Sequence, residues 1–123
     1  MSTHIRTRQS QASGFTEFKG ALAENYILQS LKTQFEVPLR YWPSARSAEV
    51  DFILQDKDYI FPIEVKSGIN VRGKSLQIYN TKFQPKYRIR YSGLNLSKDD
   101  NLLNIPLFMS DYTTKIFNLL ECI

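Results

Sequence analysis

Two β-prone segments on either side of a short polar stretch constrain the fold of this chain more than any other feature. They are Glu49–Leu54 and Tyr59–Lys66, and both are rich in branched and aromatic residues. Between them, Gln55–Asp58 is polar enough to form a turn. The pattern predicts an antiparallel β-hairpin in the middle of the chain.

Helical periodicity and breaker residues predict further elements around this hairpin, in the order α-β-β-β-α-β with a late addition. These are a helix from near Thr16 to near Thr33, a strand over Leu39–Trp42, a helix over Ser75–Phe83 that stops before Pro85, a strand over Tyr87–Tyr91, and a short strand near Leu103–Ile105 followed by a terminal helix. The buried face expected for the first helix consists of Phe18, Ala21, Leu22, Leu28, Leu31 and Phe35. Such an order is typical of an α/β protein built in layers.

The length and composition are those of one globular domain. The chain has 123 residues, of which 42% are hydrophobic and 23% charged. Residues 1–14 are polar and predict a disordered lead-in or linker, which leaves a single domain over residues 15–120. The sequence contains no apolar run of membrane-spanning length and no secretory signal pattern. The single cysteine, Cys122, cannot form an internal disulfide, so we expect a cytoplasmic protein without membrane contact.

An acidic and a basic residue on the second hairpin strand suggest chemistry. Glu64 and Lys66 are two apart, so both point to the same face. With a four-residue turn, Asp51 lies roughly opposite Pro62 on that face, and Glu64 is its diagonal neighbour at about 7–8 Å. Two carboxylates this close favour a cation between them, and Mg²⁺ or Mn²⁺ prefers such oxygen ligands. The main-chain carbonyl of Val65 could add a further oxygen, and Lys66 could assist a metal-bound water.

Glu24 on the first helix is a fourth member of this candidate site. It shares a helix face with Ala21, Leu28 and Leu31, and a carboxylate on an apolar stripe needs a partner. A cation at the sheet, or Lys66 itself, could serve. Each residue also has an ordinary explanation: a solvated E-x-K pair, a polar strand end for Asp51, and the rim of the helix stripe for Glu24.

The positive charge of the chain is concentrated in one segment. The net charge is only +4, but Ser67–Ser97 contains no Asp or Glu. Its basic residues are Arg72, Lys74, Lys82, Lys86, Arg88 and Arg90. Such a segment could contact DNA phosphates, or it could be a solvated helix face and an edge strand.

A competing motif lies at the start of the same segment. Gly68–Ser75 fits G-x-x-x-x-G-K-[ST], the pattern of a phosphate-binding P-loop, and it follows a predicted strand and precedes a predicted helix. The preceding strand is too polar for a nucleotide-binding fold, since it carries Glu64 and Lys66. About fifty residues follow the motif, which is short for the parallel strands that such a fold requires. Nucleotide binding is therefore the weakest of the alternatives.

Several short stretches together resemble a known family. They are Gly20–Tyr26, Tyr41–Trp42, Glu49–Phe52, Ile63–Gly68, Ser75–Leu76, Pro85–Lys86 and Ile105–Leu107. The family is a domain of unknown function found C-terminal to AAA-type ATPases in many bacterial and archaeal proteins, and that domain is similar to the restriction-endonuclease-like, or PD-(D/E)xK, nucleases. The resemblance covers roughly Phe15–Tyr112. It implies a mixed central sheet flanked by helices, and a chain that is either a fragment of a longer ATPase or a stand-alone copy.

The resemblance also implies roles for the candidate residues. Asp51 and Glu64 would bind the metal, Lys66 would assist the water, and Glu24 would be the acid of the helix. We expect a nuclease-like domain that cleaves or docks to DNA with Mg²⁺ or Mn²⁺, beside an ATPase module that this chain lacks. The alternatives are a catalytically inactive module for DNA binding or assembly, including self-association, and nucleotide binding through Gly68–Ser75.

Overall fold

The computed structural model describes residues 8–36, 40–42 and 50–121, with side chains for residues 18–36 and 50–121. The helices are α1 (Arg8–Gln34), α2 (Ser75–Phe83), the short 3₁₀ helix η2 (Leu107–Tyr112) and α3 (Thr113–Glu121). The strands are β1 (Arg40–Trp42), β2 (Val50–Asp56), β3 (Tyr59–Val65), β4 (Arg88–Ser92), β5 (Ser97–Asp99) and β6 (Leu102–Pro106). The predicted α-β-β-β-α-β order is confirmed by α1, β1, β2, β3, α2 and β4, and the late addition consists of β5, β6, η2 and α3.

The strands form one mixed six-stranded sheet in the order β1-β2-β3-β4-β6-β5. The pairs β1–β2, β2–β3 and β5–β6 are antiparallel, whereas β3–β4 and β4–β6 are parallel. The helix α2 is the crossover between the parallel strands β3 and β4, and its observed bounds match the prediction. The chain is therefore an α/β protein with a mixed central sheet.

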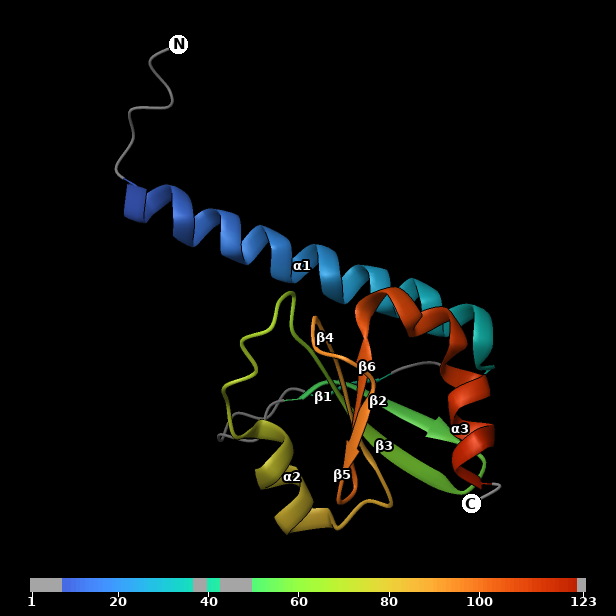
Figure 1. The fold of residues 1–123 in the computed structure, drawn as a ribbon. Coiled ribbons are helices and arrows are strands. Elements are labelled where there is room, and N and C mark those ends of the chain that lie inside the picture. Colours follow the sequence, from blue (N-terminus) through green and yellow to red (C-terminus); the bar gives the residue numbers. More distant parts are fainter. Residues whose placement is uncertain (1–7, 37–39, 43–49, 122–123) are drawn as a thin grey trace.

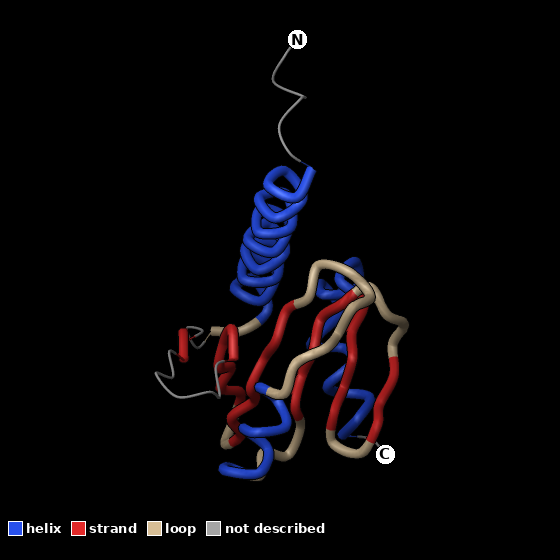
Figure 2. The backbone as a smooth tube through the Cα atoms, turned by 90° about the vertical axis from the view of Figure 1, so that its left-hand side faces the viewer, coloured by secondary structure: helices blue, strands red, loops and turns tan. Residues whose placement is uncertain are grey.

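Helices cover both faces of this sheet (Figures 1 and 2). On one face, Ile27 and Leu31 of α1 and Phe117 of α3 pack into a cluster with Ile63 and Ile89 of the central strands. On the other face, a smaller cluster joins α2 to β2. Its residues are Val50, Ile53, Leu76 and Tyr79. Since both faces are covered, the functional groups must emerge at the ends of the strands. No helix in the described part of the chain is long and apolar enough to cross a membrane.

The buried face of α1 differs from the prediction. Ile27 and Leu31 are fully buried, whereas Phe18 and Leu22 are 59% and 53% exposed. Ala21 is exposed as well, and Leu28 and Phe35 are half-buried. The N-terminal half of α1 extends beyond the sheet, so none of the strands in the described residues packs against that half (Figures 1 and 2). The helix also begins at Arg8, so residues 8–14 are helical and not a disordered lead-in; residues 1–7 lie outside the described residues.

The hairpin between β2 and β3 has a tighter turn than predicted. Asp56 pairs with Tyr59, so the turn consists of Lys57 and Asp58, and Lys57 takes a left-handed φ of 56°. As a result Ile53, and not Asp51, lies opposite Pro62. A shift of two residues keeps each side chain on its predicted face, because side chains alternate with a period of two.

Candidate active site

Glu64 lies at the C-terminal end of β3, and Lys66, predicted to be in the strand, is the first residue after it. Glu64 is the penultimate residue of β3 and is 9% exposed. The ammonium of Lys66 lies 3.6 Å from Oε1 of Glu64, and the lysine side chain is 31% exposed. The main-chain N–H of Lys66 donates to the carbonyl of Tyr91 on β4, which fixes the backbone at this point. A buried carboxylate thus lies beside an ammonium group that reaches solvent.

Asp51 reaches the same end of β3 from the neighbouring strand. Its Oδ2 accepts a 2.7 Å hydrogen bond from the main-chain N–H of Val65. Because Phe52 pairs with Ile63, continuing the register by one residue brings Asp51 level with Glu64. The observed register thus differs by two residues from the register that the longer turn had predicted.

Glu24 joins this group from α1. It lies three residues before Ile27 and seven before Leu31, on the buried stripe of the helix. Burial, the nearby charge of Asp51 and a hydrogen bond between the two side chains raise the pKa of Glu24 from 4.5 to about 7. Two carboxyl groups can hydrogen-bond only when one of them holds a proton. The protonated carboxyl of Glu24 is therefore the donor of this hydrogen bond, and Asp51 is the acceptor.

Charged acids are unfavourable at this site. Burial raises the pKa of Glu64; the charge of Lys66 lowers it, and the charge of Asp51 raises it further. A divalent cation held by Asp51 and Glu64 would relieve this cost for Glu64, and the carbonyl of Val65 would offer a third hard oxygen. The donor types fit Mg²⁺ or Mn²⁺. In the described part of the chain, however, no cluster of three or more His, Cys, Asp or Glu residues has its ligand atoms arranged for a metal ion.

The loop from Ser67 to Lys74 runs next to these groups. Gly73 has a φ of 131°, and a β-carbon at this position would lie 3.7 Å from Nζ of Lys66 and 3.8 Å from Oε1 of Glu64. The P-loop motif is this same loop. The ammonium of Lys66 and the carboxylate of Glu64 both lie against its backbone at Gly73. The geometry therefore favours a loop that covers the acidic site.

The predicted nucleic-acid-binding residues differ in their partners and in their exposure. Arg90 pairs with Glu64 across the parallel β3–β4 register, whereas Lys86 lies 3.0 Å from Glu121 of α3. Nε of Arg88 donates to Oδ1 of Asn101. Arg72, Lys74 and Lys82 are exposed on the loop and on α2. Among these residues Arg90 is the one whose backbone register aligns it with a candidate acid.

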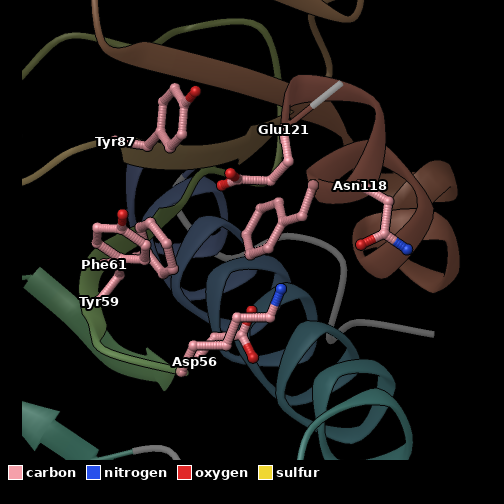
Figure 3. A pocket seen from close by; sticks show the side chains of 8 residues that line it. Asp56, Tyr59, Phe61, Tyr87, Asn118 and Glu121 are labelled. Atoms are coloured by element: carbon pink, nitrogen blue, oxygen red, sulfur yellow. The ribbon is translucent and has the colours of Figure 1, made fainter. Parts of the chain in front are cut away.

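A small hollow lies at the opposite end of β3, away from Asp51 and Glu64. Tyr59, Phe61, Tyr87 and Glu121 are among its lining residues (Figure 3). Its free volume of about 20 Å³ is room for roughly one water molecule. It is too small for an organic ligand. A shallow groove of about 230 Å³ instead adjoins Glu24, between α1 and β2.

Sequence reasoning missed Asn104, which is 1% exposed in the centre of β6. Its Oδ1 accepts from Nε of Arg90 at 3.0 Å and from Oγ of Ser92 at 2.6 Å. One polar residue inside the apolar run Leu102–Pro106 was the available signal, since a buried amide needs partners. The partners themselves depend on the β4–β6 register, which is a long-range feature.

Comparisons with known proteins agree with the family resemblance at its coarser level. A family model described as "Domain of unknown function (DUF4143)" matches residues 19–108, which include all four candidate site residues. This family is in general associated with AAA-type ATPases. Searches of the curated proteins and of the solved structures found no match. Since the family model covers well over half of the sequence, the chain belongs to the DUF4143 family.

Proposed function

We propose that this domain hydrolyses DNA phosphodiesters with Mg²⁺ or Mn²⁺, in the manner of a PD-(D/E)xK nuclease. The observation that carries the proposal is the meeting of Glu24, Asp51 and Glu64 beside Lys66 at one end of the sheet. Burial and mutual repulsion raise the pKa values of Glu24 and Glu64, so their charged forms are unfavourable there. A divalent cation would make the charged forms more favourable. Clusters of acids with shifted pKa values are typical of functional sites.

Each residue has a distinct role in this proposal. Asp51 and Glu64 hold the cation together with the carbonyl of Val65. The cation, when bound, acidifies a water molecule and offsets the charge that develops on the phosphate. Lys66 orients the attacking water or neutralises the phosphate, since its ammonium reaches both Glu64 and solvent. Glu24, with a pKa of about 7, exchanges a proton near neutral pH.

The proposal is tested by cleavage of supercoiled plasmid and of single-stranded DNA with Mg²⁺ or Mn²⁺. Wild type, Asp51→Ala and Lys66→Ala are compared after identical purification. We expect cutting by the wild type and a loss of about 100-fold or more in each variant. Equal residual cutting by all three proteins would indicate a contaminating nuclease and would refute catalysis by this site.

One observation favours a second candidate function. The absence of a ready three-ligand metal cluster among the described residues is what a nuclease fold without catalysis would show. Such a domain would dock an ATPase onto DNA, or would mediate self-association, without cutting. Thermal unfolding with and without Mn²⁺ separates the two candidates: stabilisation that is lost in Glu64→Ala supports a metal enzyme, and no stabilisation supports the docking module.

The association of the family with AAA-type ATPases supports a further part of the proposal. We propose that the domain acts beside an ATPase module, on the same chain or on a partner chain. Nucleotide binding would then belong to that module and not to the Gly68–Ser75 loop. Unchanged ATP binding by Lys74→Ala, or no binding at millimolar ATP by the wild type, would agree with this assignment.

A further inference from the structure

Arg90 is held in a fixed orientation on the face of β4 that the candidate site uses. Arg90 pairs with Glu64 in the β3–β4 register, and the charges of the two side chains interact. Yet among the described residues Arg90 forms no ion pair within 4.0 Å. A guanidinium has five N–H donors, and here only Nε donates, to Oδ1 of Asn104. The remaining donors have no acceptor in the described part of the chain.

Asn104 is itself fixed by four hydrogen bonds. Oδ1 accepts from Arg90 and from Ser92, and Nδ2 donates to the carbonyls of Leu94 at 3.1 Å and Asn95 at 3.0 Å. Every hydrogen-bonding position of the amide is therefore used. A saturated, buried amide cannot rotate without losing several bonds, so it sets the direction of the Arg90 side chain.

The same network supports the loop over the site. The turn after β4, which Asn104 holds, contains Gly93, and the N–H of Gly93 donates to the carbonyl of Gly68 at 2.8 Å. The orientation of Arg90 and the position of the covering loop thus depend on one set of hydrogen bonds. Free donors on an oriented guanidinium match two oxygens of one phosphate.

We propose that Arg90, oriented by Asn104, binds the non-bridging oxygens of a DNA phosphate at this site, and that Asn104 is a positioning residue. The inference rests on the proposed function for its substrate. The sequence expectation named six basic residues without distinguishing among them. Here one of them contributes through directed hydrogen bonds, and the others contribute through charge alone.

The test measures the binding of a fluorescently labelled DNA duplex by anisotropy, in EDTA, between 50 and 200 mM salt. Over this range the affinity for DNA falls steeply when the protein contacts many phosphates. Arg90→Gln is expected to weaken binding about tenfold and to lower the slope of log affinity against log salt by about one. Arg90→Lys keeps the charge, so it should keep the slope but lose most of that affinity. Asn104→Ala should resemble Arg90→Lys.

Arg88→Gln is the matched comparison, because Arg88 lies on the same face of β4 with its Nε on an asparagine, but two residues further from Glu64. We expect a smaller loss from it than from Arg90→Gln. Equal losses, or wild-type binding by Arg90→Lys, would overturn the inference. If Asn104→Ala does not fold, the two Arg90 variants still decide. If the wild-type protein binds DNA but never cuts it, and the Arg90 variants show the expected losses, hydrolysis is refuted and this inference stands. If the wild-type protein binds no DNA, both proposals are overturned.

Discussion

Charged side chains are stabilised at one end of β3 and destabilised at the other. We call them the carboxylate end (Glu24, Asp51, Glu64 and Lys66) and the hairpin end (Tyr59, Lys86 and Glu121). At the hairpin end, Lys86 lies 3.0 Å from Glu121 and 4.3 Å from the ring centre of Tyr59. The hydrogen bond to Glu121 is the main cause that raises the pKa of Lys86, so the charged form is favoured. At the carboxylate end, burial raises the pKa values of Glu24 and Glu64, so the charged forms are disfavoured.

The difference separates a structural contact from a site suited to a ligand. Exposed, already paired charges contribute little to stability and have no need of a further partner. Buried like charges persist only where another group compensates them or where function requires them. The two groups of residues lie at opposite ends of one short strand, so each end is an internal control for the other.

The largest expected difference is between the two lysines in DNA cleavage. Lys66→Ala should reduce cleavage about 100-fold or more, because it removes the ammonium beside Glu64 that orients the water or neutralises the phosphate. Lys86→Ala should change cleavage less than about threefold, because Lys86 lies at the hairpin end and already pairs with Glu121. Initial rates on the same plasmid provide the comparison. Similar losses in the two variants would mean that the strand ends are not functionally distinct.

The next largest effect concerns the loop over the carboxylate end. A β-carbon on Gly93 would lie 3.1 Å from the carbonyl carbon of Gly68 and 3.2 Å from its oxygen. Gly93→Ala should therefore lower stability by about 1–3 kcal/mol, since backbone atoms must move apart. Gly20→Ala in α1 meets no atom within 4 Å and should instead raise stability by about 0.5–1 kcal/mol. Denaturant unfolding of both variants measures the change in the free energy of unfolding, which should be negative for Gly93→Ala and positive for Gly20→Ala.

A smaller effect is the pH dependence of stability from Glu24. Between about pH 4.5 and 7 the folded protein keeps a proton on Glu24 that the unfolded chain has lost. Stability therefore falls as the pH rises through this range. In EDTA at pH 8, Glu24→Gln should melt a few degrees higher than the wild type, and its melting temperature should depend less on pH. The exposed Glu36→Gln is the control, and an equal gain from it would contradict the assignment.

The smallest effect is expected at the hairpin end itself. Glu121→Gln removes the partner of Lys86 at a site where both residues are exposed to solvent. The melting temperature should change by no more than about two degrees, and 0.5 M salt should remove the difference. A shift of several degrees would show that this end is a stabilising centre and would weaken the contrast.

The sequence predicted the elements well where local patterns decide. The bounds of α2 match because Pro85 follows the helix closely, and the hairpin follows from its two β-prone segments. Local patterns failed for α1, where apolar residues lie on several sides of the helix and only the sheet determines that Ile27 is buried and Phe18 is not. They also failed for β5, a short, fully exposed strand whose residues carry no β signal and which exists by pairing with β6.

The candidate site was predictable in its members more than in its geometry. Glu24 interacts with Asp51, and Glu64 interacts with Asp51 and Lys66, because the face of each residue follows from its period along helix or strand. Their roles in a metal site stay a prediction. The alignment of Asp51 with Glu64 depended on a turn of two residues, which a left-handed Lys57 permits and a polar stretch does not specify. The role of Asn104 depended on parallel pairing between distant strands, which no local signal encodes.

The central claim is that the acids of the carboxylate end hold a divalent cation. The most direct measurement is anomalous diffraction from crystals of the protein soaked in Mn²⁺. We predict a single strong peak between Asp51 and Glu64, close to the carbonyl of Val65, that disappears in Glu64→Ala. Well-ordered Asp51 and Glu64 side chains with no peak between them would contradict the account.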